Sequence, residues 1–251
     1  MPALHRLLAG ARERLYRYGA VRALKDRVRP LKHLLAGRDD IYLVVERINE
    51  ARGMRRPVRV VFDVGAAWGD KTVTFLGSFP HCTCYCFEPQ RASRARLRQR
   101  IARWTDRVVV CDYGLFNQDR TLDLRLYSYP DASSVLPLPA YMRREGKSEI
   151  GTEPIRVRRL DDCLHDLGVS AIDLLKVDVE GVEREVLEGA RRALEVTENV
   201  FIEISPLRKG SRSTDHLAVF TLLHEAGFTF MGQYGDYWFS KDPDVLRQWC
   251  G

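Results

Sequence analysis

Short apolar runs alternate with helical patterns between residues 57 and 114, and this alternation constrains the fold more than any other feature of the chain. The runs VRVVFDVG, CTCYCFEP and RVVVCDYG contain the β-branched and aromatic residues that favour strands. GDKTVTFLGSF and RASRARLRQRIARW, which separate them, have the apolar spacing of helices. Units of this length predict an α/β fold with a parallel sheet and helices on both faces.

The same patterns divide the chain into an arm and a main domain. Residues 1–56 are predicted to form a basic helical N-terminal arm, and residues 57–251 the α/β domain. An insertion at 120–160 contains two alternating strand patterns around a loop-rich stretch. The strand and helix alternation then returns, and the last part predicts a terminal pair of strands.

The net charge of +6 is concentrated in the arm. Residues 1–38 hold ten basic and two acidic residues, whereas the other 213 residues hold 30 basic and 32 acidic ones. Leucines recur at helical spacing among the arginines, which predicts a basic amphipathic helix. Two interpretations remain open: the arm packs on the domain, or it contacts an acidic membrane surface or a partner protein.

The sequence predicts a cytoplasmic protein, with the arm as the part that would lie at a membrane surface. No apolar run approaches the ~20 residues that a membrane-spanning helix needs. Arginines interrupt the N-terminus too often for a signal-peptide core. Cys111, Cys163 and Cys250 are scattered and do not form the pattern of a secreted disulfide framework.

The first strand ends in the glycine turn FDVGAAWGD, at the position where open α/β sheets bind nucleotides. Gly65 and Gly69 permit a left-handed backbone and a close approach to a ligand. A dinucleotide site uses G-x-G-x-x-G, whereas this turn has G-x-x-x-G. Ala66, Ala67 and Trp68 complete the predicted cofactor turn.

Acidic residues at the strand ends indicate which cofactor the turn would take. Asp63, before the first glycine, would repel a pyrophosphate but suits the cationic groups of S-adenosylmethionine. Glu88 ends the second strand, and its carboxylate suits the ribose hydroxyls of either cofactor class. We therefore expect S-adenosylmethionine as the cofactor. The predicted site also includes Pro89 and, after the third strand, Asp112, Tyr113 and Gly114.

Three cysteines and a histidine in the second strand resemble a metal-binding pattern. Cys82, Cys84 and Cys86 alternate, so all three face one side of a strand, spaced ~6–7 Å apart. That spacing is too wide for one zinc ion, and cysteine packs well as a small apolar residue. His81 would lie at the far end of the strand from the cofactor. We interpret the group as core packing and predict no metal site.

The run IDLLKVDVEGVE places charges on a strand that should be central. Buried charges are costly unless they are paired or used in function. Lys176, Asp178 and Glu180 share one strand parity, so their side chains should converge at the carboxyl end. Glu203, in FIEIS, stands at the matching end of the next strand. The cluster is predicted either to face the cofactor and substrate or to form a structural ion-pair network.

These motifs resemble the FkbM-type S-adenosylmethionine-dependent methyltransferases. FDVGAAWGD, CFEP, RLDD, IDLLKVDVEGVEREVLEGA and FIEIS occur in the order and spacing of that family, over about residues 58–240. The segment DLLKVDVEG-x-E-x-x-VL-x-GA is the specific part, and DASSVL is similar to a serine-bearing loop of the family. One departure is Ala67, where the family commonly has asparagine.

The resemblance implies a class I methyltransferase fold, a Rossmann-like three-layer sandwich. Its seven-stranded, mostly parallel sheet has an antiparallel last strand, and the predicted N-terminal helices precede it. The resemblance also implies methyl transfer to a hydroxyl of a sugar, glycan or polyketide-like natural product. We expect Asp178 and Glu180 to act as candidate general bases and Lys176 to tune a neighbouring pKa. Asp178 also counts among the cofactor residues, and the candidate substrate residues are Ser133, Ser134, Tyr141 and Glu203.

Two other functions remain open at this point. The basic arm raises the possibility of an RNA methyltransferase, although its residues between the arginines are mostly aliphatic. The fold could also serve a nucleoside-binding protein without catalysis, against which the retention of Asp63, Glu88 and Asp178 argues. We therefore expect a small-molecule or glycan acceptor and no nucleic-acid partner.

Overall fold

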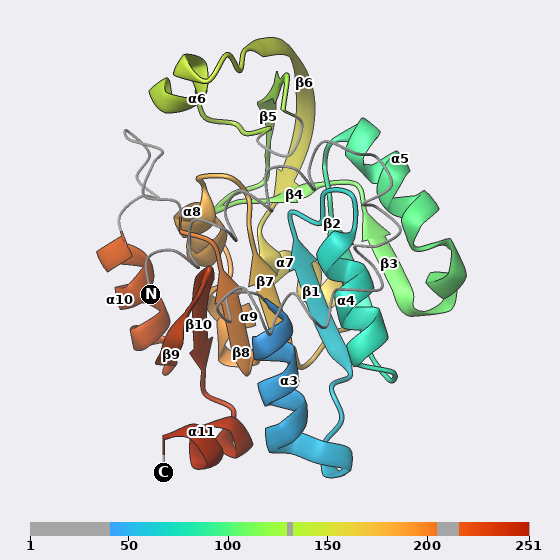
Figure 1. The fold of residues 1–251 in the computed structure, drawn as a ribbon, viewed down its shortest axis with the longest axis vertical. Coiled ribbons are helices and arrows are strands. Elements are labelled where there is room, and N and C mark those ends of the chain that lie inside the picture. Colours follow the sequence, from blue (N-terminus) through green and yellow to red (C-terminus); the bar gives the residue numbers. More distant parts are fainter. Residues whose placement is uncertain (1–40, 130–132, 205–215, 251) are drawn as a thin grey trace, which may run out of the picture. The chain divides into compact units, whose positions relative to one another are not determined.

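The protein is described by a computed structural model that covers residues 41–129, 133–204 and 216–250. Within these residues a seven-stranded sheet lies between two layers of helices, and a smaller three-stranded sheet accompanies it (Figure 1). This arrangement confirms the predicted three-layer α/β fold. Predicted helices within residues 1–40 lie outside the described part of the chain.

The large sheet has the strand order β3-β2-β1-β7-β8-β10-β9. Pairing is parallel from β3 through β8, whereas β10 is antiparallel to both of its neighbours. The predicted mostly parallel sheet with an antiparallel last strand is therefore confirmed. The strands are β1 (Val60–Val64), β2 (Thr83–Phe87), β3 (Val108–Cys111), β7 (Leu174–Val177), β8 (Asn199–Ile202), β9 (Thr229–Tyr234) and β10 (Asp236–Ser240).

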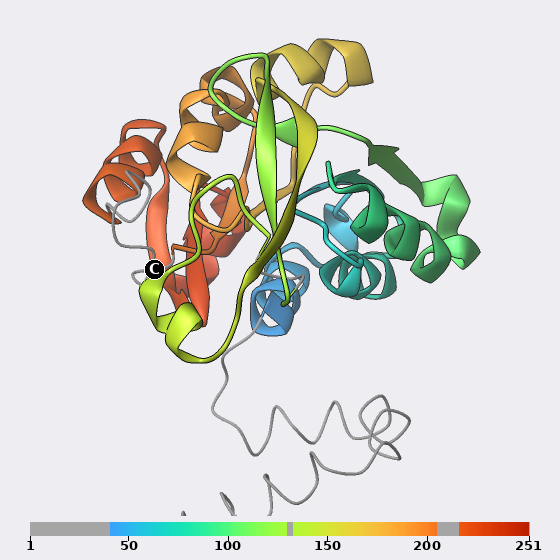
Figure 2. The same cartoon turned by 90° about the horizontal axis from the view of Figure 1, so that it is seen from above.

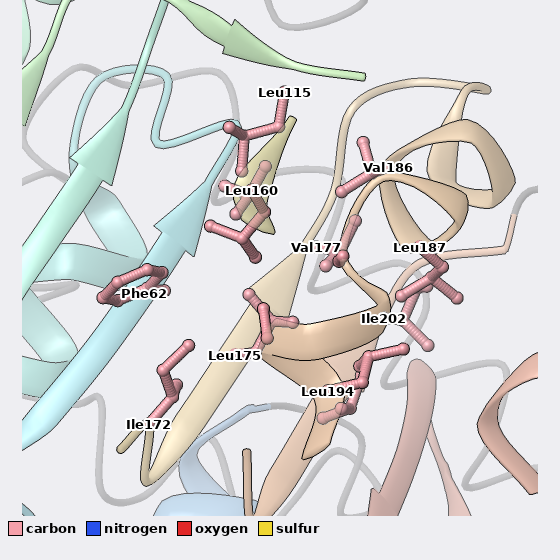
Figure 3. Packing of buried hydrophobic residues seen from close by; sticks show 14 of the residues in the cluster. Phe62, Leu115, Leu160, Ile172, Leu175, Val177, Val186, Leu187, Leu194 and Ile202 are labelled. Carbon is pink, nitrogen blue, oxygen red and sulfur yellow. The ribbon is translucent and has the colours of Figure 1, made fainter. Parts of the chain in front are cut away.

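One face of this sheet packs against four helices that follow the insertion. Phe62, Val177 and Ile202 of the sheet are fully buried in one apolar cluster, and Val177 and Ile202 lie beside Val186 and Leu187 of α8 (Figure 3). Each such aliphatic side chain contributes roughly 1.5–3 kcal/mol through burial. The four helices are α7 (Leu160–Leu167), α8 (Glu183–Glu188), α9 (Arg191–Glu195) and α10 (His216–Glu225).

The other face packs against α3, which the sequence analysis assigned to the N-terminal arm. Ile41, Val44 and Ile48 of this helix are fully buried in the same apolar cluster as Val61 and Trp238 of the sheet. The helix belongs to the same compact unit as the sheet, and this unit begins at Asp40. The expected boundary between residues 56 and 57 therefore falls inside the unit. The helices of this cluster are α3 (Ile41–Arg52), α4 (Asp70–Ser78), α5 (Arg91–Arg100) and α11 (Pro243–Trp249). Two short helical turns follow α3 and α5, namely η1 (Gly53–Arg55) and η2 (Ala102–Arg107).

The cysteines of β2 belong to this second core. Cys82, Cys84 and Cys86 are fully buried, as the packing interpretation predicted. The predicted spacing of their side chains is wrong for one pair, because the Sγ atoms of Cys84 and Cys86 lie 3.8 Å apart. Side chains in strands lean along the strand direction, so two that lean toward each other approach more closely than their Cα atoms. Burial raises the pKa of Cys82 to about 12, so that side chain is a neutral thiol.

The insertion forms the smaller sheet, in the order β4-β6-β5. β5 (Arg120–Tyr127) and β6 (Glu149–Arg158) pair antiparallel and lie side by side in Figure 2. β4 (Gly114–Leu115) pairs parallel with β6, and α6 (Ala140–Arg144) lies between β5 and β6 in the chain. Leu124, Ile155 and Val157 form a small core of their own. Leu122 and Leu124 of β5 and Ile155 and Val157 of β6 also line the cavity at the carboxyl ends of β1 and β2.

Candidate active site

A cavity of about 330 Å³ lies between the large sheet and the insertion. It reaches the carboxyl ends of β1 and β2, which is where open α/β sheets bind their ligands. Its volume is at the lower end of the range for small-molecule sites. The predicted residues that line it are Gly65, Ala66, Ala67, Trp68, Glu88, Pro89, Gly114, Ser133, Lys176, Asp178, Glu180 and Glu203.

The glycine turn after β1 forms one wall of the cavity, and its glycines are required by geometry. Gly65 has a φ of 73°, and a Cβ there would lie 1.9 Å from the backbone oxygen of Asp178. Gly69 does not line the cavity; it has a φ of 84° and caps α4. A Cβ on Gly69 would lie 2.6 Å from Leu97. The short distance at Gly65 shows that the turn lies directly against the segment that follows β7.

Glu88 stands in the wall beside this turn, as predicted. It is 6% exposed, and its carboxylate oxygens accept hydrogen bonds from the backbone N–H groups of Ala67 and Gln90, both at 2.8 Å. Burial raises the pKa of Glu88 to about 7, although those two N–H groups lower it. Carboxylate oxygens have further lone pairs, so the side chain can also accept a ribose hydroxyl. The chemistry of this wall fits the nucleoside part of S-adenosylmethionine.

Asp63 lies behind the turn rather than on the cavity wall. Its side chain is fully buried, and Oδ2 accepts a hydrogen bond of 2.6 Å from the hydroxyl of Thr72. Oδ1 lies 3.2 Å from the ammonium of Lys176. The predicted contact between Asp63 and a cationic cofactor is therefore absent in this geometry, because Lys176 neutralises the carboxylate from within the sheet.

The end of β3 contributes less than predicted. Asp112 is exposed, Tyr113 is half-buried, and neither side chain lines the cavity. The ring of Tyr113 packs instead against Phe87, with 5.8 Å between ring centroids. Gly114 does line the cavity, and a Cβ there would lie 3.4 Å from Pro89.

Three further carboxylates gather on the cavity wall. Each of Asp178, Glu180 and Glu203 offers an oxygen within 4.8 Å of the others. Strand parity is not the reason for this convergence, because β7 ends at Val177. The loop that follows turns instead through a φ of 61° at Glu180, which brings the side chains together. The predicted cluster thus exists, but a strained loop positions it.

The carboxylates differ in protonation. Burial raises the pKa of Glu203, neighbouring Asp178 raises it further, and together they bring it to about 10. Burial also opposes ionisation of Asp178, but the ammonium of Lys176 outweighs it and holds the pKa of Asp178 below its usual range. At neutral pH Glu203 is therefore protonated and Asp178 ionised. The three carboxylates are also close enough together to hold a metal ion.

The serine loop of the insertion has two distinct roles. Ser133, one of the predicted substrate residues, lines the cavity. Ser134 is 1% exposed and does not line it; its hydroxyl donates a 2.7 Å hydrogen bond to the backbone oxygen of Glu180. Tyr141, in α6, does not line the cavity. Ser134 thus acts on the acidic loop rather than on a substrate.

Several lining residues were missed by sequence reasoning. Lys71, at the start of α4, carried no signal in the sequence. The apolar wall of the insertion did carry one, since its strands alternate apolar and polar residues. The alternation did not reveal which surface the apolar side chains cover. The residues of this apolar wall are Leu122, Leu124, Val135, Ile155 and Val157.

Relatives in other organisms resemble parts of this chain. The 2-O-methyltransferase NoeI of Sinorhizobium fredii is 26% identical over 160 residues, covering 61% of this chain and 65% of the relative. The 31-O-demethyl-FK506 methyltransferase FkbM of Streptomyces tacrolimicus is 33% identical over 160 residues, covering 55% and 62%. The AMB antimetabolite synthetase AmbE of Pseudomonas aeruginosa is 29% identical over 202 residues, covering 68% and 10%. The matches thus span less than two thirds of these relatives.

A solved structure of similar fold is a putative rRNA methylase from Clostridium thermocellum. It is 12% identical, with a TM-score of 0.48 and coverage of 83% of this chain and 98% of that one. The identity is too low to bear on activity.

Most residues of the candidate site lie in the part of the chain that a family model matches. The model described as "Methyltransferase FkbM domain" matches residues 63–230, which include Glu88, the acidic cluster and most of the sheet. Methyltransferases of this family use S-adenosylmethionine as the methyl donor, so the predicted cofactor is confirmed. The chain belongs to the FkbM methyltransferase domain family.

Proposed function

We propose that this methyltransferase acts on oxygen, transferring the methyl group to a hydroxyl of a sugar, glycan or polyketide-like acceptor. The observation that carries the proposal is the acidic cluster, which places the ionised Asp178 on the cavity wall beside the glycine turn. A hydroxyl is a weak nucleophile and benefits from a general base within reach. The names of two relatives, a 2-O-methyltransferase and a 31-O-demethyl-FK506 methyltransferase, agree with an oxygen acceptor.

The cofactor residues would be those of the wall around Glu88. Glu88 would accept hydrogen bonds from the ribose of the cofactor, and Pro89 and Gly114 would border its adenine ring. The glycine turn would lie along the rest of the molecule. S-adenosylmethionine supplies a methyl group activated by a positively charged sulfur. The chain's own contribution is to hold an acceptor oxygen in line with that group, which is the main source of rate in such reactions.

Asp178 is the proposed base, and Glu180 is the second candidate. The acceptor hydroxyl would give its proton to a carboxylate oxygen of Asp178, which stays ionised because Lys176 lies 3.4 Å away. Glu203 keeps its own proton near neutral pH and so cannot take the acceptor's. It would instead orient the carboxylate of Asp178 or the substrate.

The backbone at Glu180 supports a functional role for this loop. A left-handed conformation costs a residue with a Cβ about 1–2 kcal/mol, and Glu180 adopts it at φ 61°. Glycine would remove that cost but would also remove a carboxylate from the cavity. Strained residues cluster at active sites because function maintains them.

The charge and polarity of the cavity favour a non-nucleic acceptor. A phosphate backbone would meet Asp178 and Glu180, whose charges repel it. Leu122 and Ile155 of the insertion offer apolar contact to the carbon skeleton of a small acceptor. The basic segment 1–38, which prompted the RNA alternative, lies outside the described residues.

A radiolabelled methyl donor and an acceptor panel test the proposal. The panel contains oligosaccharides, hydroxylated macrolides and RNA, and the product is treated with alkali to distinguish ethers from esters. We expect label in an alkali-stable ether on a hydroxylated small molecule or glycan. Label confined to RNA, or only to alkali-labile esters, would reject the proposed acceptor class.

For location, we propose a cytoplasmic enzyme whose basic segment 1–38 contacts anionic lipid, as its charge of +8 favours. In the described part of the chain, every helix is too short or too polar to cross a bilayer. Removing residues 1–38 should abolish sedimentation with anionic liposomes, and equal sedimentation of the shortened chain would refute the idea.

A further inference from the structure

A buried cation lies at the centre of the site. Lys176, in β7, has only 3% of its side chain exposed. Its Nζ atom donates to the carbonyl oxygens of Gly65 at 2.8 Å and Val64 at 3.3 Å. The same atom lies 3.2 Å from Oδ1 of Asp63 and 3.4 Å from Oδ2 of Asp178. The ammonium thus donates hydrogen bonds to two carbonyl oxygens and forms ion pairs with two carboxylates.

Three of the four acceptors belong to two separate parts of the active site. Val64 and Gly65 open the glycine turn that lines the cofactor side of the cavity. Asp178 opens the acidic loop after β7. The two segments touch, since a Cβ on Gly65 would lie 1.9 Å from the backbone oxygen of Asp178. Lys176 therefore lies at the junction between the cofactor wall and the proposed base.

A simple counter-ion role does not account for these contacts. Asp63 is fully buried and needs a positive partner, and Thr72 already supplies one of its hydrogen bonds. A lysine that served Asp63 alone would not need to reach two turn carbonyls and a second carboxylate.

A role for Lys176 in proton transfer does not fit its raised pKa. Burial lowers the pKa of Lys176, but the carboxylates of Asp63 and Asp178 outweigh burial and raise it above its ordinary value. The ammonium therefore keeps its proton across the physiological range.

We propose that Lys176 is a positioning residue, which fixes the carboxylate of Asp178 against the glycine turn so that base and cofactor wall keep one geometry. The proposal rests on the proposed function, in which Asp178 receives the acceptor proton. It separates Lys176 from the catalytic residues, because the ammonium contacts protein groups on both segments and acts through Asp178.

Other charges also face Asp178 and must stay constant in a test. Glu203 follows β8 and shares a hydrogen bond with Asp178, and Glu180 lies in the same loop. Lys71 of α4 attracts the carboxylate, and Glu183 of α8 interacts unfavourably with it. A variant that changes only Asp63 and Lys176 leaves all four in place.

The test uses a neutral pair of replacements. Lys176→Met alone would leave the carboxylate of Asp63 buried and unpaired, and would report mainly on folding. The double variant Asp63→Asn/Lys176→Met removes both charges, and the hydroxyl of Thr72 can still donate to the amide oxygen. Asp63→Asn alone is the matched control, because it keeps Lys176 beside Asp178. Lys176→Gln on the Asp63→Asn background repeats the test with a polar replacement.

Two readouts follow, neither of which needs an acceptor. The first is the titration of the Asp178 carboxyl by carbon NMR in the cofactor-free protein, with the signal assigned from Asp178→Asn. The second is calorimetry with S-adenosylmethionine. Thermal unfolding verifies that each variant is folded.

We expect the double variant to raise the pKa of Asp178 by about 1–3 units relative to Asp63→Asn, since it loses an adjacent opposite charge. Its affinity for S-adenosylmethionine should fall by about tenfold or more, because two turn carbonyls lose a charged donor. A pKa or an affinity equal to that of the control would overturn the proposal. Failure of the unaltered protein to bind S-adenosylmethionine would instead contradict the proposed function, and the carboxyl titration would still decide the role of Lys176.

Discussion

At the scale of single residues, two non-glycine residues in left-handed conformations mark the active site. Ala67 has a φ of 46° and Glu180 a φ of 61°. The backbone N–H of Ala67 donates a hydrogen bond to Glu88, so the left-handed conformation helps to hold the Glu88 carboxylate in the cavity wall. Asparagine adopts left-handed conformations more readily than alanine, which gives a physical reason for the asparagine common at this position in the family.

Ala67→Asn should therefore stabilise the protein. We expect the free energy of unfolding to rise by up to about 1 kcal/mol, because asparagine reduces the cost of the left-handed backbone. Urea unfolding measures this change. Ala92→Asn is the control, since Ala92 is exposed in α5 and the same substitution should cost roughly 0.7 kcal/mol there. Equal effects of the two substitutions would contradict the explanation.

A second residue-scale prediction concerns Glu183, which holds the acidic loop. Its Oε1 accepts from the N–H of Gly181 at 2.8 Å, whereas Oε2 is buried without a hydrogen-bond partner among the described residues. Burial raises the pKa of Glu183 to about 7. The folded state thus holds this proton more tightly than the unfolded chain, so stability from this group is complete below about pH 4.5 and is lost as pH rises to about 7.

Glu183→Gln removes this titration while keeping an acceptor for Gly181. Between pH 4.5 and 7.5 the unaltered protein should lose up to about 3 kcal/mol of unfolding free energy relative to the variant. Denaturant unfolding at several pH values provides the comparison, in which the other titrating groups cancel. Parallel stability curves would show that Glu183 is not protonated in the folded state.

At the scale of elements, a buried arginine joins the first described helix to the last one. Arg52, at the end of α3, has 1% of its side chain exposed and pairs with Asp173, Glu198 and Asp242. Asp242 caps α11 by accepting from the N–H of Asp244. The network lies at the amino end of β7 and β8, away from the cavity, so it is structural.

Arg52→Met should destabilise the protein by about 3 kcal/mol or more, because it leaves the fully buried Asp242 with less compensation. Guanidinium unfolding measures the loss. The matched control is Arg55→Met, at an exposed position in η1, which should change stability by no more than about 0.5 kcal/mol. Similar losses in both variants would mean that the network contributes little.

At the scale of the whole molecule, regular patterns were predictable and irregular ones were not. The alternation of strands and helices determines the parallel sheet, and the ends of β2 and β7 then bring Glu88 and Asp178 to one cavity. The position of α3 was not recognised, because its apolar stripe does not show which surface it covers.

Within the site, the errors have physical causes that a linear pattern does not contain. Asp63 was expected to face the cofactor, but Lys176 on the neighbouring strand pairs with it behind the turn. The acidic cluster was expected from strand parity, whereas a left-handed residue after β7 produces it. Ser134 was expected to contact substrate, but its hydroxyl binds the backbone of Glu180. The first and third depend on contacts between distant segments, and the second depends on a local backbone conformation.

The most direct test of the account is single-turnover methyl transfer by the unaltered protein and by Asp178→Asn, at saturating S-adenosylmethionine with a hydroxyl acceptor identified from the panel. The account predicts that Asp178→Asn transfers about 100-fold more slowly or worse, as expected for loss of a general base. Its dissociation constant for the cofactor should stay within about threefold of the unaltered value. Equal transfer rates, or a rate lost only in proportion to cofactor affinity, would contradict the role of Asp178 and with it the proposed mechanism.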